Sequence, residues 1–306
     1  MADVVAAFAP GSASNLGPGF DCLGVALSGC GDRVTARRAR GAGVTVVSVS
    51  DPRIPLDAGR NTAAIAAAAV LRRAGSAEGL DLVVEKGLPL AGGLGGSAAS
   101  AVAGAVAADA LVGARLPREA LLEAALEAES VVAGRHADNV APSLYGGLVL
   151  ILGLEPPRLV FARVHDSVAL VVSTPSYGVE TRKARSVLPP EIPRGAGVAQ
   201  AAHLAGLVLA LERGDGALIG RAMADQIAEP ARAPLYPGYA EARKAALAAG
   251  AHGVSVSGAG PTLLAVVPRG AGPAVAEAIE RAYQDAGFEA RSLQAEVDRQ
   301  GARVVA

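Results

Sequence analysis

One segment guides the interpretation of this sequence: Leu88-Pro-Leu-Ala-Gly-Gly-Leu-Gly-Gly-Ser-Ala-Ala-Ser100. Its four glycines, all between positions 92 and 96, permit tight turns and a close approach of the backbone to a ligand. Ser97 is the expected N-cap of a helix that runs to about Leu111. A glycine loop that leads into a helix start presents unpaired N–H groups, so the segment predicts an anion site, most often for phosphate.

Other readings of this glycine loop are possible. A Walker loop requires Lys and then Ser or Thr after its last glycine, and here Ser97 and Ala98 follow, which excludes it. Residues 93–98 fit the dinucleotide pattern G-x-G-x-x-A, but that pattern follows its strand almost directly, whereas residues 86–92 intervene here. A plain glycine turn with a helix cap remains open on spacing alone.

Composition limits the classes of protein to consider. The 306 residues suffice for two domains or one large one, and the net charge of −1 gives no field that would attract nucleic acid or an anionic membrane. Aromatic residues make up only 3% of the chain, so platforms for stacking bases are scarce. The four histidines lie far apart in sequence, so we do not expect a histidine-rich metal site.

The sequence also bears on the compartment. Cys22 and Cys30 fit neither a metal motif nor a disulfide framework, which favours two free thiols in a reducing cytoplasm. The N-terminus lacks the basic region of a signal peptide. The apolar run Ala98–Leu111 is too short for a membrane span and contains Asp109, so we expect a buried helix there.

Two further loops carry polar side chains between apolar segments. In Ala9–Gly24 the glycines and prolines argue against regular structure, and Asn15 and Asp21 either bind a ligand or cap turns. In Gly134–Gly147, Asp138-Asn139 forms either an Asx turn or part of a site.

The pattern of strands and helices changes near a soft domain boundary at residues 153–166, and the second half reads as α+β. We divide the chain into 1–160 and 161–306, and the second unit reads as ferredoxin-like. Asn61 is a natural N-cap for an alanine-rich helix to about Arg73. The pattern further predicts a helix at Pro117–Val132, a helix at Asp215–Ile227, a loop at Ala231–Gly238 and a third glycine loop at Ser257–Pro261.

Taken together, these loops resemble the GHMP small-molecule kinases. The resemblance is carried by Ala9–Gly24, by Pro89–Ser100, which matches P-x-x-x-G-L-G-S-S-A, and by three further segments: His136–Pro142, Thr181–Pro189 and Gly253–Thr262, with Ile227-Ala-Glu-Pro-x-Arg232 also matching. Within the family, they are most similar to the members that phosphorylate the amino acid homoserine. Gly96 departs from the pattern, which has a serine there, and this puts one side-chain phosphate contact in doubt.

The resemblance implies a two-domain α+β fold, with a left-handed β-α-β unit in the N-terminal domain, a ferredoxin-like C-terminal domain and an active site in the cleft between them. It implies ATP and Mg²⁺ as cofactors, with Ser97 and Glu129 as the metal ligands. Without it, Glu129 would read as a solvated side chain on an alanine-rich helix. The residues expected to bind ATP are Asn61, Lys86, Pro89, Leu90, Ala91, Gly92, Gly93, Leu94, Gly95, Gly96, Ser97, Ala98 and Ala99.

For the acceptor, the resemblance implies L-homoserine, a zwitterion with a terminal hydroxyl. Its carboxylate would pair with Arg185 and Arg232, and its ammonium with Asp21. The remaining residues expected at the substrate are Asn15, Asn139, Thr181 and Gly258. The residues expected to take part in catalysis are Ser97, Glu129, Asn139 and Arg185.

Asn139 also bears on the mechanism, because Asn cannot accept a proton. We therefore predict direct attack of the substrate hydroxyl on the γ-phosphate without an essential side-chain base, with Asp138 as the carboxylate that could overturn this. The alternatives are a kinase of the same family acting on a mevalonate-like or sugar substrate, and a binding protein on an inactive kinase scaffold. A homodimer is expected from the family.

Overall fold

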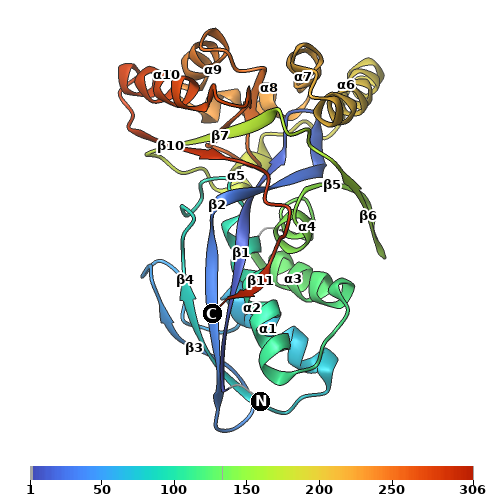
Figure 1. Ribbon diagram of the computed structural model, residues 1–306, viewed down its shortest axis with the longest axis vertical. Helices are drawn as coiled ribbons and strands as arrows, with labels where there is room; N and C mark the ends of the chain where they lie inside the picture. Colours follow the sequence, from blue (N-terminus) through green and yellow to red (C-terminus); the bar gives the residue numbers. More distant parts are fainter. Residues whose placement is uncertain (1–2, 133, 306) are drawn as a thin grey trace.

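The structure, a computed structural model, describes residues 3–132 and 134–305. Its N-terminal part, most of which lies in the lower half of Figure 1, is built on a seven-stranded sheet with the order β11-β1-β2-β4-β3, to which β5 and β6 are added alongside β2. These strands are β1 (Val4–Asn15), β2 (Gly19–Ala39), β3 (Gly43–Val49), β4 (Gly79–Glu85), β5 (Leu148–Leu154), β6 (Pro157–Ala162) and β11 (Arg303–Val305).

Four helices accompany this sheet: α1 (Thr62–Ala74), α2 (Gly96–Val112), α3 (Arg118–Val132) and α4 (Val140–Tyr145). The strands β3 and β4 run parallel, with α1 between them in sequence, which is the β-α-β unit that was expected. The helix α2 consists mostly of Ala, Gly and Val, and it lies buried against α1, α3 and the sheet. Small side chains let these backbones approach closely, which accounts for the alanine-rich composition.

The C-terminal part is a four-stranded antiparallel sheet with the order β10-β7-β9-β8. Its strands are β7 (Val168–Pro175), β8 (Gly253–Val256), β9 (Leu263–Pro268) and β10 (Ala290–Ala295), and α10 (Gly272–Asp285) connects β9 to β10. The remaining helices lie between β7 and β8: α5 (Thr181–Ser186), α6 (Arg194–Arg213), α7 (Gly216–Ala222), α8 (Ala228–Arg232), the 3₁₀ turn η1 (Ala233–Leu235) and α9 (Tyr239–Ala248). This β-α-β-β-α-β order confirms the ferredoxin-like prediction.

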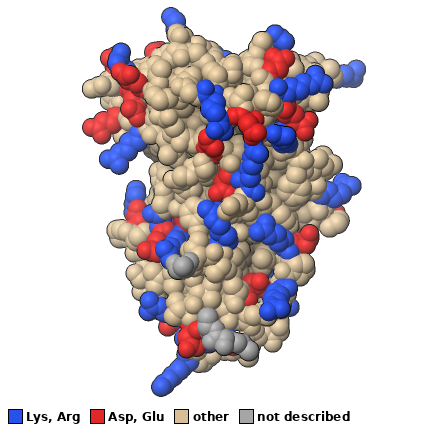
Figure 2. Space-filling model, viewed as in Figure 1, with Lys and Arg blue, Asp and Glu red and all other residues tan. Residues whose placement is uncertain are grey.

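The chain leaves the first sheet after Ala162 and enters the second at Val168, but Arg303–Val305 return to pair with β1. The division at 160/161 predicted from sequence does not include this return. On the face drawn in Figure 2, basic and acidic side chains are interspersed over both parts, in keeping with the net charge of −1.

Several local predictions were wrong. The segment Ala9–Gly24 is largely strand: β1 continues to Asn15, and a register shift between Pro10 and Ser12 accommodates the proline within the ladder. The second polar loop contains α4. The helix predicted at Asp215–Ile227 ends at Ala222, because Asp225 accepts hydrogen bonds from Ile227, Ala228 and Glu229 and so begins α8 instead.

Candidate active site

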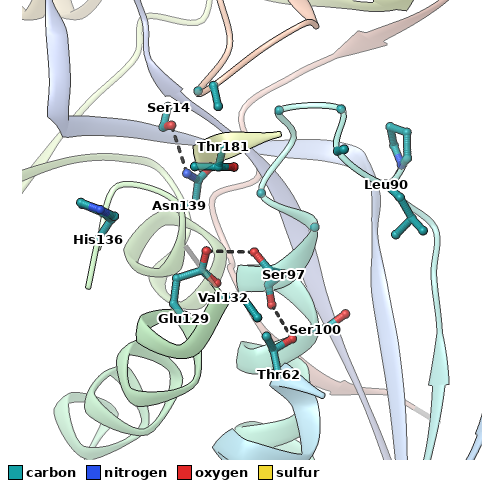
Figure 3. A pocket seen from close by; sticks show the side chains of 18 of the residues that line it. Ser14, Thr62, Leu90, Ser97, Ser100, Glu129, Val132, His136, Asn139 and Thr181 are labelled. Atoms are coloured by element: carbon teal, nitrogen blue, oxygen red, sulfur yellow. Dashed lines mark hydrogen bonds between the residues drawn. The ribbon is translucent and has the colours of Figure 1, made fainter. Parts of the chain in front are cut away.

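A cavity of about 330 Å³ lies where the two parts of the chain meet (Figure 3). The N-terminal part contributes the phosphate loop, which we define as residues 89–97, together with Glu129 and Asn139. The C-terminal part contributes Arg185, Arg232 and Gly258. Of the residues predicted from sequence, Leu94, Ala98 and Ala99 do not line the cavity, because their side chains are buried in the core.

The carbonyl groups of the phosphate loop are held by donors from several segments. Gly92 O accepts from Thr262 N (3.2 Å), Gly93 O from Ser257 Oγ (2.7 Å), Leu94 O from Ser12 N (3.2 Å) and Gly96 O from Lys86 Nζ (2.7 Å). Within the described residues, the N–H groups of residues 92–95 donate to no acceptor. With the N-terminus of α2 directly behind them, these N–H groups form an anion site.

Two glycines make this conformation possible. Gly93 has φ of +82° and Gly95 has φ of +65°, a region that L side chains rarely adopt. A Cβ at Gly95 would lie 2.2 Å from Ser12 Oγ and 2.9 Å from Asn139 Oδ1, and one at Gly93 would lie 2.4 Å from Ser257 O. A side chain at either position would therefore push the loop off its supports.

Ser97 does not cap α2, contrary to the prediction. The N-cap is Gly95, with no side-chain cap, and Ser97 Oγ instead donates to Glu129 Oε1 over 2.9 Å (Figure 3). Glu129 Oε2 is buried without a partner in the described structure. Burial raises the pKa of this carboxyl to about 7, the Asp138 carboxyl adds to the rise, and the Ser97 hydrogen bond opposes it.

A hydroxyl beside a buried carboxylate oxygen that lacks a partner fits a hard divalent cation. No group of three or more His, Cys, Asp or Glu side chains suited to a metal occurs within the described ranges. A magnesium ion needs fewer protein ligands than that, because it usually keeps several waters and binds substrate phosphates. Ser97 and Glu129 would therefore be sufficient as protein ligands for such an ion.

Asn61 and Lys86 line the cavity, but their polar atoms are already engaged. Asn61 caps α1 by accepting from Ala63 N and Ala64 N, and its Nδ2 donates to Pro55 O. Lys86 Nζ contacts Asp32, Gly96 O and Ser100 Oγ. Nucleotide contacts by these two side chains remain predictions.

Charged side chains also gather along the cavity. Arg185 forms a bidentate pair with Asp21, at 2.7 and 3.1 Å, and its Nε is buried without a partner within the described residues. Arg232 is buried, donates to Ala184 O and Gly258 O, and lies over the same Phe20 ring as Arg185. The guanidinium groups of Arg185 and Arg232 and the carboxylate of Asp21 thus lie together along the cavity, in a cluster that we call the charged wall.

Asn15 and Gly258 support this charged wall. Asn15 Nδ2 donates to Gly258 O over 3.0 Å, and its Oδ1 accepts from the backbone N–H of Asp21 over 3.1 Å. Gly258 N in turn donates to Ser14 O. The side chain of Asn15 therefore fixes the turn that carries Asp21, which is the structural alternative weighed from the sequence. Thr181, the first residue of α5, also lines the cavity.

Asn139 is oriented by two serines of β1. Ser12 Oγ donates to Asn139 Oδ1 (2.9 Å), and Asn139 Nδ2 donates to Ser14 Oγ (3.0 Å). The neighbouring Asp138 is buried, and burial raises its pKa, with the Asp21 charge adding to the rise and a hydrogen bond from Ser14 opposing it. Sequence reasoning missed both serines, although their i, i+2 spacing puts them on one face of a strand.

Comparison with known proteins agrees with this geometry. The family model described as GHMP kinases N terminal domain matches residues 61–147, and the one described as GHMP kinases C terminal matches residues 207–285. A homoserine kinase from Arabidopsis thaliana is 41% identical, covering 98% of this chain and 84% of the relative. One from Xanthomonas campestris is 39% identical, covering 98% and 94%.

A solved structure points the same way. The crystal structure of a homoserine kinase from Cytophaga hutchinsonii has a TM-score of 0.95 and 38% identity, covering 100% of this chain and 98% of that one. Full-length similarity in sequence and in fold, together with a glycine loop aimed into a cleft between two such domains, leaves one assignment: this chain belongs to the GHMP kinase family.

Proposed function

We propose that this protein catalyses ATP-dependent phosphorylation of the hydroxyl of L-homoserine, giving O-phospho-L-homoserine. The observation that supports homoserine as the phosphate acceptor is the charged wall, where Asp21 pairs with Arg185 beside Arg232. A zwitterionic amino acid matches both charges of this wall, because its ammonium can pair with Asp21 and its carboxylate with the two arginines. The homoserine kinases at about 40% identity over nearly the whole chain support the same substrate.

The donor end of the cavity fits ATP with Mg²⁺. The free N–H groups of the phosphate loop would receive the phosphates, and Ser97 and Glu129 would hold the metal. A metal held there would, together with the N–H groups of the loop, neutralise charge that develops on the phosphoryl group during transfer.

The acceptor hydroxyl is positioned by Asn139, whose amide the two β1 serines hold in place. The hydroxyl oxygen forms a bond to the γ-phosphorus, the bond from that phosphorus to the bridging oxygen breaks with its electron pair leaving on ADP, and the hydroxyl proton passes to an oxygen of the transferred phosphoryl group and from there to solvent water. Asn139 cannot take this proton, so transfer depends on positioning and charge neutralisation. Asp138 accepts a hydrogen bond from Ser14 and serves to orient that serine.

A coupled ADP-release assay with homoserine, threonine, mevalonate and shikimate tests this proposal. We expect homoserine to give the highest kcat/KM by at least about tenfold. Preference for mevalonate or a sugar would favour another kinase of the family. Release of ADP with none of these acceptors, despite nucleotide binding, would favour an inactive scaffold; the intact Ser97–Glu129 pair argues against that reading.

We further propose that the protein acts in the cytoplasm as a homodimer paired through α6. This helix is the one in the described part of the chain that is long and apolar enough to cross a membrane, and only 22% of its most apolar stretch is buried. Its exposed residues Val198, Ala202, Ala205 and Leu209 recur at the 3–4 spacing of a helix-packing stripe. An apolar face of this kind fits a second protein surface.

Charged residues at the two ends of this stripe indicate that a second copy of the chain packs against it. Arg194 and Glu212 flank the stripe on the same side of α6, and neither has an ion-pair partner within the described residues. In an antiparallel two-fold pair, Arg194 of each copy would meet Glu212 of the other. Light scattering of purified protein should give a dimer that Arg194→Glu weakens and that Arg194→Glu with Glu212→Arg restores. A monomer, or a dimer changed by Phe161→Glu on β6 instead, would contradict this surface.

A further inference from the structure

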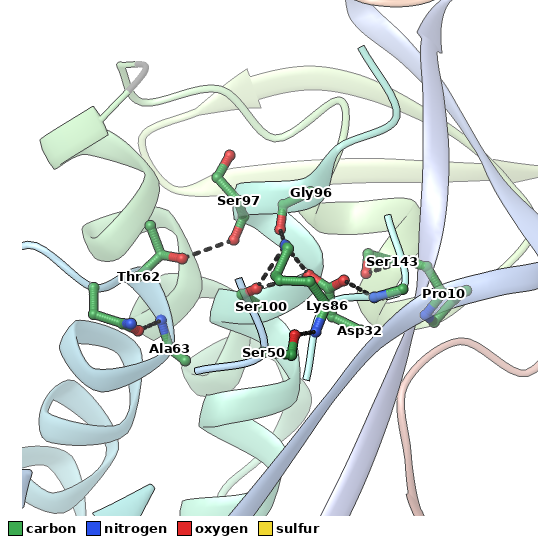
Figure 4. A network of polar contacts seen from close by, with 12 residues as sticks. Pro10, Asp32, Ser50, Thr62, Ala63, Lys86, Gly96, Ser97, Ser100 and Ser143 are labelled. Carbon is green, nitrogen blue, oxygen red and sulfur yellow. Dashed lines mark hydrogen bonds and ion pairs between the residues drawn. The ribbon is translucent and has the colours of Figure 1, made fainter. Parts of the chain in front are cut away.

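A buried ion pair lies beneath the phosphate loop, outside the chemistry described so far (Figure 4). Asp32 comes from β2 and is fully buried, and Lys86 directly follows β4 with its side chain 6% exposed. Ser100, on the second turn of α2, donates to Asp32 Oδ2 over 2.7 Å. Asp32 Oδ1 accepts from Gly87 N over 3.1 Å, so both carboxylate oxygens are used.

The ammonium of Lys86 has three donors, and each has a target. One goes to Asp32, one to Ser100 Oγ at 2.9 Å, and one to the carbonyl oxygen of Gly96 at 2.7 Å. Gly96 is the first residue of α2 and lies in the phosphate loop. The buried pair is therefore connected to the phosphate loop through a backbone carbonyl.

That carbonyl matters because a peptide unit is planar and trans. The C=O of Gly96 and the N–H of Ser97 belong to one peptide plane and point in opposite directions. A donor that draws the carbonyl toward Asp32 thereby turns the Ser97 N–H toward the cavity. The carbonyls of Gly92, Gly93 and Leu94 are held in the same way by other segments, so Lys86 completes a row of fixed peptide planes.

We propose that Lys86, held by Asp32 and Ser100, is a positioning residue that orients the Gly96–Ser97 peptide for phosphate binding, rather than a cation that contacts the phosphates. The inference rests on the proposed function, because it assumes that nucleotide phosphates bind at this loop. The two roles make opposite predictions for Asp32. If Lys86 positions the loop, loss of Asp32 releases its support; if Lys86 is a direct ligand, loss of Asp32 frees its charge for the phosphates.

The test is a double-variant cycle with Asp32→Asn, Lys86→Met and both together, using calorimetric binding of ADP with Mg²⁺. A positioning role predicts that each single variant weakens ADP binding by about tenfold. The double variant should bind ADP no more weakly than the single variant with the lower affinity. Adenosine, which lacks phosphates, should bind all variants as it binds the parent protein, and the KM for homoserine should be unchanged. Lys244→Met, at an exposed lysine of α9, is the matched control.

Retained or tighter ADP binding by Asp32→Asn, with loss only in Lys86→Met, would overturn the proposal in favour of a direct ligand. Equal loss of adenosine and ADP would also overturn it, because that pattern reports general damage to the site. Removing one member of a buried pair can prevent folding. Ser100→Ala, which keeps both members of the ion pair, then gives the answer: weaker ADP binding supports the proposal, and parent-like or tighter binding refutes it. Failure of the parent protein to bind ADP would instead count against the proposed function.

Discussion

Replacing Glu129 by Gln should stabilise the ligand-free protein at alkaline pH relative to the parent, while abolishing magnesium-dependent activity. Glu129 is buried on α3, one of its carboxylate oxygens has no partner in the described structure, and burial raises its pKa from 4.5 to about 7. The carboxylate form is therefore held in the fold at a cost. We expect a buried carboxylate that binds a metal to destabilise the fold in this way when no metal is bound.

The size of the effect follows from proton linkage. Stability linked to the protonated carboxyl is fully present below pH 4.5 and is lost as the pH rises through about 7, because the unfolded chain releases its proton first. The total loss is about 3 kcal/mol, of which roughly 2–3 kcal/mol falls between pH 5 and pH 8.5. Gln does not titrate, so the variant escapes this loss.

The assay is urea unfolding at pH 5 and pH 8.5, in EDTA and without nucleotide. The free energy of unfolding of Glu129→Gln, relative to the parent, should increase by roughly 2–3 kcal/mol between the two pH values. Glu119→Gln, on the exposed side of the same helix, is the control and should show no such increase. A difference between variant and parent that is the same at both pH values would refute the reasoning, as would magnesium-dependent activity that survives in Glu129→Gln.

Three other substitutions test the remaining roles. Asp138→Asn should lower kcat by less than about a hundredfold, and a loss of roughly a thousandfold or more with the fold intact would show that a side-chain base is essential. Asp21→Asn should raise the KM for homoserine by about 10- to 100-fold in steady-state assays while leaving the KM for ATP nearly unchanged; equal increases in both would exclude Asp21 as the ammonium partner. Ser97→Ala should raise the Mg²⁺ concentration for half-maximal activity by about tenfold, and an unchanged magnesium titration would remove Ser97 from the metal site.

Much of the fold could be predicted because its signals are local. The glycine loop before an alanine-rich helix and the alternation of the C-terminal half both have short-range causes. The errors arose where pairing with a segment distant in sequence determines the secondary structure. β1 extends through Pro10 because β2 supplies a partner with a bulge in register, and no local pattern shows that. The start of α8 does have a local signal in Asp225, whose carboxylate accepts hydrogen bonds from three backbone N–H groups, but the apolar periodicity around it favours a continuous helix.

In the site, too, roles that depend on local sequence could be predicted, and roles that depend on distant segments could not. Asn61 performs the local role that its position suggests and caps α1. Ser97 has the same local chemistry, yet its hydroxyl is directed to Glu129, a residue of another helix. The cluster of Asp32, Lys86 and Ser100 joins three distant segments, so spacing could not predict it. The pairing of Asp21 with Arg185 likewise depends on how the two halves of the chain meet.

The return of Arg303–Val305 to the edge of β1 has a consequence for biosynthesis. As the polypeptide emerges from the ribosome, the first sheet has every other strand available by residue 162, yet its outer strand is still unmade. Until translation reaches position 305, the edge of β1 that pairs with β11 at Ala6–Phe8 faces water or a chaperone, and a nascent chain halted earlier would expose an open edge to its neighbours. Completion of the N-terminal half is thus coupled to synthesis of the last residues that the structure describes.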